Sequence, residues 1–225
     1  MIKNVILVCL VFFLNPFLAY ADLATNKWRF GIYGGFQDTS PSRVSTFSDN
    51  GTVISFDAEW DAKPLSMPPY WGIRTSFWDT QKTAWEIDFV HSKAYANSKT
   101  LTQNSFDHLQ FTDGINVLSI SRIWQLSEPK TFPDFLPYVG LGSGISLPYV
   151  EIIKSTNPSI ARTMEYQFGG LSGQAQFGVR YSITRDLNVI FEYKITHVGL
   201  NVETAASQDL KTNLVTNALN VGLEF

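Results

Sequence analysis

The chain has 225 residues, of which 17 are Lys or Arg, 20 are Asp or Glu, and 14% are aromatic. This weakly acidic balance, without any basic run, argues against nucleic acid as the main partner. The single cysteine, Cys9, lies close to the amino terminus, so the rest of the chain has no disulfide and no thiol chemistry.

Residues 1–21 have the three parts of a secretory signal peptide. Lys3 supplies the positive start, Val5 to Leu14 form an apolar core, and Ala19-Tyr20-Ala21 is a small-residue cleavage site. The alternative is a membrane anchor, but the apolar core is too short to cross about 30 Å of hydrocarbon. We therefore predict a signal peptide at 1–21 and one mature domain at 22–225.

The mature chain is dominated by segments in which apolar and polar residues alternate with period two, and no later apolar run approaches the length of a transmembrane helix. The predicted strands, in chain order, are 27–37, 69–78, 83–95, 113–124, 136–147, 171–183, 187–197 and 216–225. The faces of the segment 113–124 cannot be assigned from its weak alternation. The pattern predicts an all-β fold, an eight-stranded antiparallel transmembrane β-barrel of the outer-membrane type, with a secreted β-sandwich as the alternative.

The connections between these strands alternate in length. The long polar ones are 38–66, 96–111, 148–170 and 198–212, and the first of them contains a further alternating segment, Ile54 to Trp60. The tight turns are 79–82 and 184–186. Because outer-membrane barrels have long extracellular loops and short periplasmic turns, we predict that both termini lie in the periplasm. We also expect a monomer, inserted by the outer-membrane barrel assembly machinery.

An eight-stranded barrel is narrow enough for side chains to fill its lumen. The alternation predicts inward charges of both signs: Arg74, Glu86, Asp88, Arg180, Glu192 and Lys194. We interpret them as a structural ion-pair network; a proton or ion path is the alternative.

The unusual polar residues fall at the end of the long loops. All three histidines, His91, His108 and His197, are expected there. Lys93 could meet a lipid phosphate, and a histidine with Asp113 or Glu151 could bind a divalent metal or transfer protons. The alternative is that these residues only solvate the barrel edge, since no spacing among them is a recognised metal signature.

At these motifs the sequence resembles the lipid A oxidase-like outer-membrane proteins. The resembling segments are Phe30-Gly-Ile-Tyr-Gly-Gly-Phe-Gln37, Met67-Pro-Pro-Tyr-Trp-Gly72, His91-Ser-Lys-Ala-Tyr95, Phe111-Thr-Asp-Gly-Ile-Asn116, Pro137-Tyr-Val-Gly140 and Thr216-Asn-Ala-Leu-Asn-Val-Gly222. The Pro-Pro-Tyr and Thr-Asp-Gly-x-Asn elements are the most specific. One departure is Tyr149, which stands where a histidine is expected in relatives.

The resemblance implies a lipid A-modifying enzyme of the outer leaflet, which oxidises the proximal glucosamine to 2-aminogluconate. It implies O2 as co-substrate and a divalent metal as a candidate cofactor. The catalytic or metal-binding candidates are His91, Asp113 and Glu151. The substrate-binding candidates are Lys93, Tyr70, Arg74 and Asn116.

Two other function classes compete with this hypothesis. A lipid A deacylase would use a His-Ser pair on a late strand, but Val198-Gly199 follows His197 where that motif requires a serine. A non-enzymatic surface barrel of the adhesin or opacity type needs only long loops, and the Ser/Thr/Asn-rich loops suit it. An oxidase predicts that His91, Lys93 and Asp113 converge on one concave patch, whereas an adhesin predicts dispersed polar residues.

Overall fold

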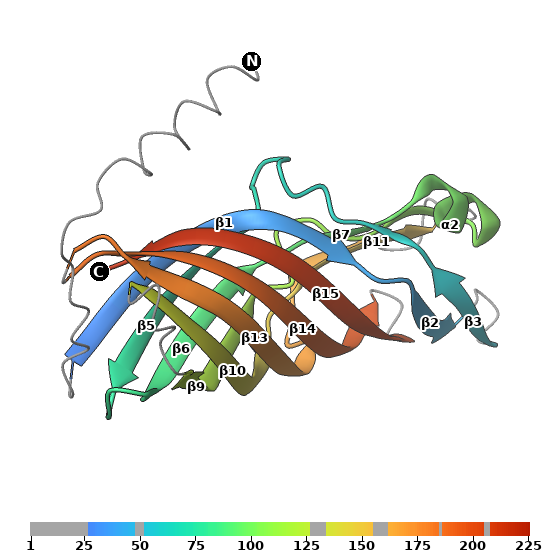
Figure 1. The fold of residues 1–225 in the computed structure, drawn as a ribbon. Coiled ribbons are helices and arrows are strands. Elements are labelled where there is room, and N and C mark those ends of the chain that lie inside the picture. Colours follow the sequence, from blue (N-terminus) through green and yellow to red (C-terminus); the bar gives the residue numbers. More distant parts are fainter. Residues whose placement is uncertain (1–26, 48–51, 127–133, 155–161, 185, 205–207) are drawn as a thin grey trace, which may run out of the picture.

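The computed structural model describes residues 27–47, 52–126, 134–154, 162–184, 186–204 and 208–225, so the predicted signal peptide lies outside the described residues. Eight antiparallel strands form a closed barrel, which confirms the predicted fold class (Figure 1). They are β1 (Lys27–Thr39), β5 (Trp71–Trp78), β6 (Thr83–His91), β9 (Val117–Gln125), β10 (Phe135–Ser146), β13 (Gly170–Ser182), β14 (Asn188–Thr204) and β15 (Gln208–Glu224). Pairing of β1 with β15 closes the ring, from Gly31–Glu224 to Thr39–Thr216.

Side chains along each barrel strand alternate between the apolar outer face and the polar lumen. Trp85 and Ile87 on β6 are exposed on the outer face, whereas Glu86 and Asp88 between them are fully buried in the lumen. The faces of β9 are now clear as well, since Leu118, Ile120 and Trp124 are exposed and the serines between them are buried. Among the described residues, no helix has the length and apolar character required to cross a membrane.

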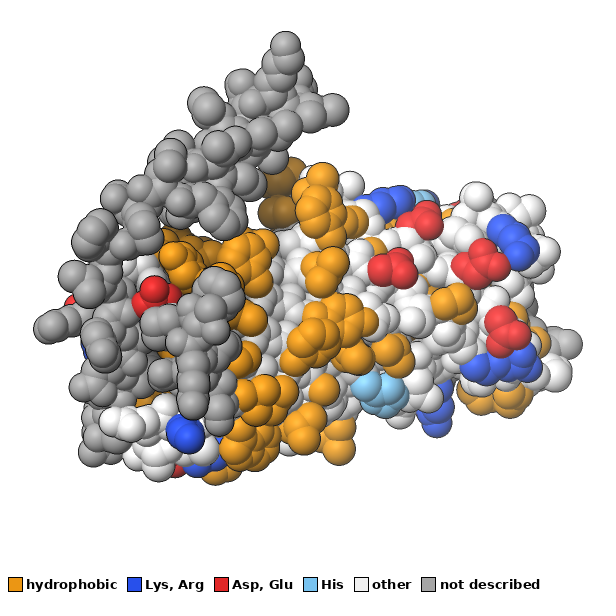
Figure 2. All heavy atoms as spheres, viewed as in Figure 1, with side chains coloured by type: hydrophobic (Ala, Val, Ile, Leu, Met, Phe, Trp, Pro, Cys, Tyr) orange, Lys and Arg blue, Asp and Glu red, His pale blue; other side chains and the backbone are white. Residues whose placement is uncertain are grey.

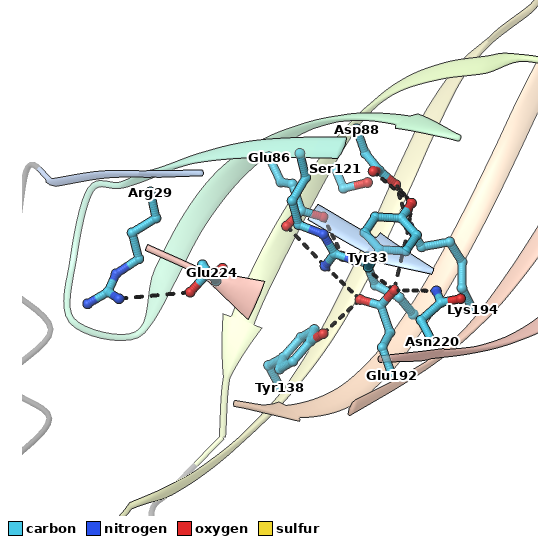
Figure 3. A network of polar contacts seen from close by, with 12 residues as sticks. Arg29, Tyr33, Glu86, Asp88, Ser121, Tyr138, Glu192, Lys194, Asn220 and Glu224 are labelled. Carbon is cyan, nitrogen blue, oxygen red and sulfur yellow. Dashed lines mark hydrogen bonds and ion pairs between the residues drawn. The ribbon is translucent and has the colours of Figure 1, made fainter. Parts of the chain in front are cut away.

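Ion pairs and hydrogen bonds fill the lumen, as Figure 3 shows. Arg74 binds both oxygens of Glu192, at 2.8 and 2.9 Å, and Glu192 also accepts hydrogen bonds from Tyr138 at 2.7 Å and Asn220 at 3.0 Å. Lys194 pairs with Asp88 and donates to the Tyr33 hydroxyl. The interpretation of these inward charges as a structural network therefore agrees with the contacts.

The long connections are not simple polar loops. They contain β2 (Ser42–Phe47), β3 (Val53–Ala58), β4 (Trp60–Asp61), β7 (Ala94–Ala96), α2 (Ser98–Gln103), β8 (Phe106–Phe111), β11 (Tyr149–Lys154) and β12 (Thr163–Tyr166). The strand expected at Ile54 to Trp60 corresponds to β3 and β4. The loop expected at 198–212 is wrong, because β14 and β15 continue as a paired hairpin through Val198–Leu214 to Thr204–Gln208.

These elements and the distal part of the β14–β15 hairpin form a folded extension of the barrel (Figure 1). One sheet adds β2 and β3 to β15, and the second sheet has the order β12-β11-β8-β7-β4. The Gln167 side chain joins β12 to β14, because its amide donates to Glu203 O at 2.7 Å and accepts from Glu203 N at 2.8 Å. Gln167 therefore links the second sheet of the extension to the first, which contains β14.

The extension has an apolar core. Its fully buried members include Val44, Phe111, Val150, Leu210 and Leu214, drawn from both sheets. This is the opposite of the barrel lumen, which is polar. Figure 2 shows the same inversion from outside, with hydrophobic side chains gathered over the barrel and charged ones beyond them on the β2–β3 side. The extension is thus built for water and the barrel for lipid.

Candidate functional site

A cavity of about 660 Å³ opens at the rim where the barrel meets the extension. Its polar lining residues are His91, Asp113, Asn116 and Gln167. Its apolar lining residues are Pro68, Trp71, Phe89, Leu147, Tyr166 and Phe168. We call it the rim pocket.

The rim pocket lies on the outer face of the barrel. His91 is the last residue of β6 and has the outward register of Trp85 and Ile87. It pairs with Trp71 on β5, whose ring stacks on the imidazole at 6.0 Å with an interplanar angle of 18°. A ligand in this pocket would therefore approach from the side of the membrane, at the end of the spanning strands.

Hydrogen bonds fix the orientation of the His91 ring. Its Nδ1 lies 2.9 Å from Asn116 Oδ1, while the Asn116 amide nitrogen donates to the carbonyls of Asp113 at 2.9 Å and Leu147 at 3.2 Å. Because those carbonyls engage the amide nitrogen, the amide oxygen faces His91 and Nδ1 must be the donor. The lone pair then lies on Nε2, which is buried and has no hydrogen-bond partner among the described residues.

The Thr112–Asn116 turn holds this arrangement. Gly114 has φ +97° and Asn116 has φ +46°, both in the left-handed region. A Cβ on Gly114 would lie 2.4 Å from Asn116 Oδ1 and 2.5 Å from His91 Nδ1. The turn is anchored by backbone bonds from Ile115 N to Ser92 O and from Tyr149 N to Gly114 O. The Thr-Asp-Gly-x-Asn motif therefore has a direct structural role beside His91.

Asp113 is an exposed acidic residue in the pocket lining. Tyr166 donates to its backbone carbonyl at 3.5 Å and packs against Tyr149, with ring centroids 5.0 Å apart. Tyr149, which stands where a histidine is expected in relatives, thus packs against Tyr166, a lining residue of the pocket.

Lys93 and Glu151 lie near the pocket but are not among its lining residues. The Lys93 ammonium is buried and donates to Ser66 O at 2.8 Å. Burial lowers the pKa of Lys93, Lys63 lowers it further, and Asp113 opposes both. Glu151 lies on β11, where it contacts His108 at 3.1 Å and accepts from Thr112 at 3.3 Å.

Tyr70 and Arg74 occupy the lumen rather than the rim. Arg74 is fully enclosed and bound to Glu192, which leaves its guanidinium no open side for a phosphate. Tyr70 is buried beside Tyr33 and Val90 in a small apolar cluster. The expected substrate contacts of these two residues do not agree with their positions, because both side chains point inward.

The three histidines do not converge. His108 pairs with Glu151 on the extension, and His197 is exposed on β14 with Gly173 and Val215 as its cross-strand partners. Neither of these directly opposed residues is a serine. In the described part of the chain, no group of three His, Cys, Asp or Glu side chains could hold a metal ion. His91 and Asp113 therefore do not fit a three-ligand metal centre.

The alternation alone did not point to Gln167 and Phe168, which lie in a segment expected to be a loop. Trp71 lies inside the Pro-Pro-Tyr-Trp-Gly motif and Gly114 inside the Thr-Asp-Gly-x-Asn motif. These motifs were a signal in the sequence from which both residues could have been predicted to lie at the site. Of the seven candidate residues, His91, Asp113 and Asn116 line the rim pocket together.

Comparisons with known proteins give a family and a fold. A family model described as an outer membrane protein beta-barrel domain matches residues 6–225. The crystal structure of OprG from Pseudomonas aeruginosa is similar over 90% of this chain and 98% of that one, at 13% identity and a TM-score of 0.50. The solid-state NMR structure of AlkL in DMPC bilayers is similar over 94% and 95%, at 11% identity and a TM-score of 0.51. No curated protein sequence matches the chain.

Proposed function

The chain belongs to the outer membrane protein β-barrel family, and from this premise we propose that it is an enzyme acting on lipid A at the rim pocket. The family implies the bacterial outer membrane. The proposed reaction is oxidation of the proximal glucosamine to 2-aminogluconate, with O2 as the oxidant.

One observation carries this proposal: an oriented histidine with an unpaired Nε2 lies in a pocket on the lipid-facing side of the rim. A water-soluble substrate could bind equally well at the tip of the extension, so it would not require a site at the rim. A lipid headgroup, by contrast, lies at the level where the spanning strands end. Trp71 and Tyr166 supply aromatic walls, and Asp113 and Asn116 supply polar ones.

The reaction balances with O2 alone as the oxidant. The substrate is lipid A whose proximal sugar has a free hydroxyl at C1 in place of a phosphate ester. This C1 hemiacetal loses its hydroxyl proton and, from the C1–H bond, a proton and two electrons. O2 gains two electrons and two protons and becomes hydrogen peroxide. Water then opens the resulting lactone to the acid, so the lipid gains one oxygen atom. His91 Nε2 is the group that accepts the hydroxyl proton, and Asp113 is the second acid/base group.

The proposal includes an orientation and partners. The extension faces outward and both termini lie in the periplasm, so that the rim pocket meets the lipopolysaccharide leaflet. The chain acts as a monomer and is inserted by the barrel assembly machinery.

Mass spectrometry of lipid A from cells with and without the chain tests the activity. We expect a mass gain of one oxygen atom, which His91→Ala abolishes. His197→Ala is the matched control, since His197 is exposed on the outer face of β14 and should leave the gain intact.

Other results would replace the proposal. Loss of an acyl chain would indicate a hydrolase. Unchanged lipid A, with the folded protein present in the outer membrane, would favour a non-enzymatic surface barrel.

A further inference from the structure

The apolar outer surface of the barrel ends at different heights on different sides of the rim. On β1, β14 and β15 the apolar outward row is broken after Phe36, Ile195 and Leu219. The next outward residues are Asp38, His197 and Asn217. On β15 one half-buried apolar residue, Val215, lies beyond this break. On this side the boundary between lipid and water is therefore sharp.

On the side of the rim pocket the apolar row continues past the strand ends. Met67 is 85% exposed and Phe168 is 60% exposed, and Leu65, Leu147 and Tyr166 are exposed as well. Leu147, Tyr166 and Phe168 line the pocket, and Met67 directly precedes Pro68, which also lines it. They follow or precede β5, β10 and β13, whose outward residues are lipid-facing. We call these five residues the collar.

The collar ends abruptly at β14. Gln167 and Gly169 are bonded to Glu203 and Asn201, so Phe168 between them adjoins that stretch of β14. The outward side chains there, Asn201 and Glu203, are polar and exposed. The extension is therefore apolar toward the pocket and polar immediately next to it.

We propose that the collar lies within the membrane boundary, and that the rim pocket therefore takes its ligand laterally from the leaflet as an acylated amphiphile. The collar is continuous with the lipid-facing belt through Trp71, Phe89 and Leu147, which line the pocket themselves. These apolar walls contact an acyl chain, while His91 and Asp113 meet the polar head. The identity of the head rests on the proposed function; the lateral entry does not.

The immersion is tested with single cysteines in a Cys9→Ala chain, in bilayers that contain lipopolysaccharide. Met67→Cys and the control Asn201→Cys carry a nitroxide, and its relaxation by O2 and by a water-soluble nickel chelate is compared. We expect the Met67 label to respond more to O2 and the Asn201 label more to nickel. Equal nickel response at both positions would overturn the proposal, and so would spin–spin broadening at Met67, because a second copy would then cover the collar.

Lateral binding is tested by native mass spectrometry of the purified barrel with lipid A added. Phe168→Asp should reduce the retained lipid at least several-fold, and Asn201→Asp should not. Equal retention in both variants would contradict the role of the collar. Immersed labels and retained lipid combined with unmodified lipid A in cells would disprove the oxidation and leave lateral entry standing.

Discussion

Glu192 is the acceptor on which the lumen network converges. It is fully buried and takes hydrogen bonds from Arg74, Tyr138 and Asn220. Among the described residues, Glu192→Leu would leave Arg74 with one carboxylate partner, Glu86, at 3.5 Å. We expect the free energy of unfolding to fall by about 3–5 kcal/mol, the usual result of leaving a buried charge unpaired. Urea unfolding in lipid vesicles, followed by tryptophan fluorescence, measures the change.

The double variant Arg74→Met with Glu192→Leu separates charge from packing. It removes the uncompensated guanidinium and should recover most of the lost stability. A double variant no more stable than Glu192→Leu would show that packing, and not the unpaired charge, causes the loss.

At the scale of single residues, the period-two alternation predicted whether a side chain points into the lumen or outward. It was a poorer guide to what that side chain binds. The inward position of Arg74 followed from Ile73 beside it, and its pairing with Glu192 agrees with the predicted network. A phosphate contact for Arg74 conflicts with that same alternation. Asn116 is a predicted substrate-binding residue, but its side chain is engaged by His91 and by the carbonyls of Asp113, Gly114 and Leu147. A spacing pattern does not contain such three-dimensional contacts.

Gly114 shows how one turn positions the site. Its φ is +97°, and a Cβ added at this residue would lie only 2.5 Å from His91 Nδ1, so Gly114→Ala is incompatible with the observed turn. We expect about 1–3 kcal/mol of strain, loss of the His91–Asn116 hydrogen bond and loss of lipid A modification. In ¹⁵N spectra of histidine-labelled protein, the His91 Nδ1–H signal should disappear.

Gly34→Ala is the matched control for this variant. Its Cβ would meet only Tyr70 O at 3.5 Å, an ordinary contact. An unaltered His91 signal in Gly114→Ala would mean that the turn does not orient the ring.

The extension is the element that the sequence predicted least well, and β14 shows why. The even-numbered residues of β14 point inward along its whole length. In the barrel lumen they are polar, at Glu192, Lys194 and Thr196, whereas in the extension they are apolar, at Val198, Leu200 and Val202. Apolar residues thus change from the odd to the even positions at residue 197. A search for one apolar face ends the strand at that change, although the backbone pairing continues.

The apolar core of the extension can be tested on the same strand. Val202→Asp would bury a carboxylate in that core, whereas Asn201→Asp places one in water. We expect Val202→Asp to increase hydrogen exchange in β8, β11 and the distal β14–β15 hairpin, with the barrel still folded. Equal exchange in both variants would contradict a common core.

At the scale of the whole molecule, two inverted interiors share the strands β14 and β15. The barrel buries charge and exposes apolar residues, and the extension does the reverse. The molecule can therefore sit in a membrane at one height only, with the inversion near the rim pocket. The site is then fixed at the boundary by the fold, independently of any contact that a ligand makes.

The direction in which the molecule points decides which leaflet the pocket meets, and it can be measured on cells. Asp57 on β3 and Lys82 in the turn between β5 and β6 are both exposed, at opposite ends of the molecule. In a Cys9→Ala background, a membrane-impermeant maleimide should label Asp57→Cys on intact cells. It should label Lys82→Cys only after the outer membrane is opened. The reverse pattern would direct the extension into the periplasm and the rim pocket to the inner leaflet, where lipopolysaccharide is absent. Lipid A could then not be the substrate, whatever the chemistry of His91.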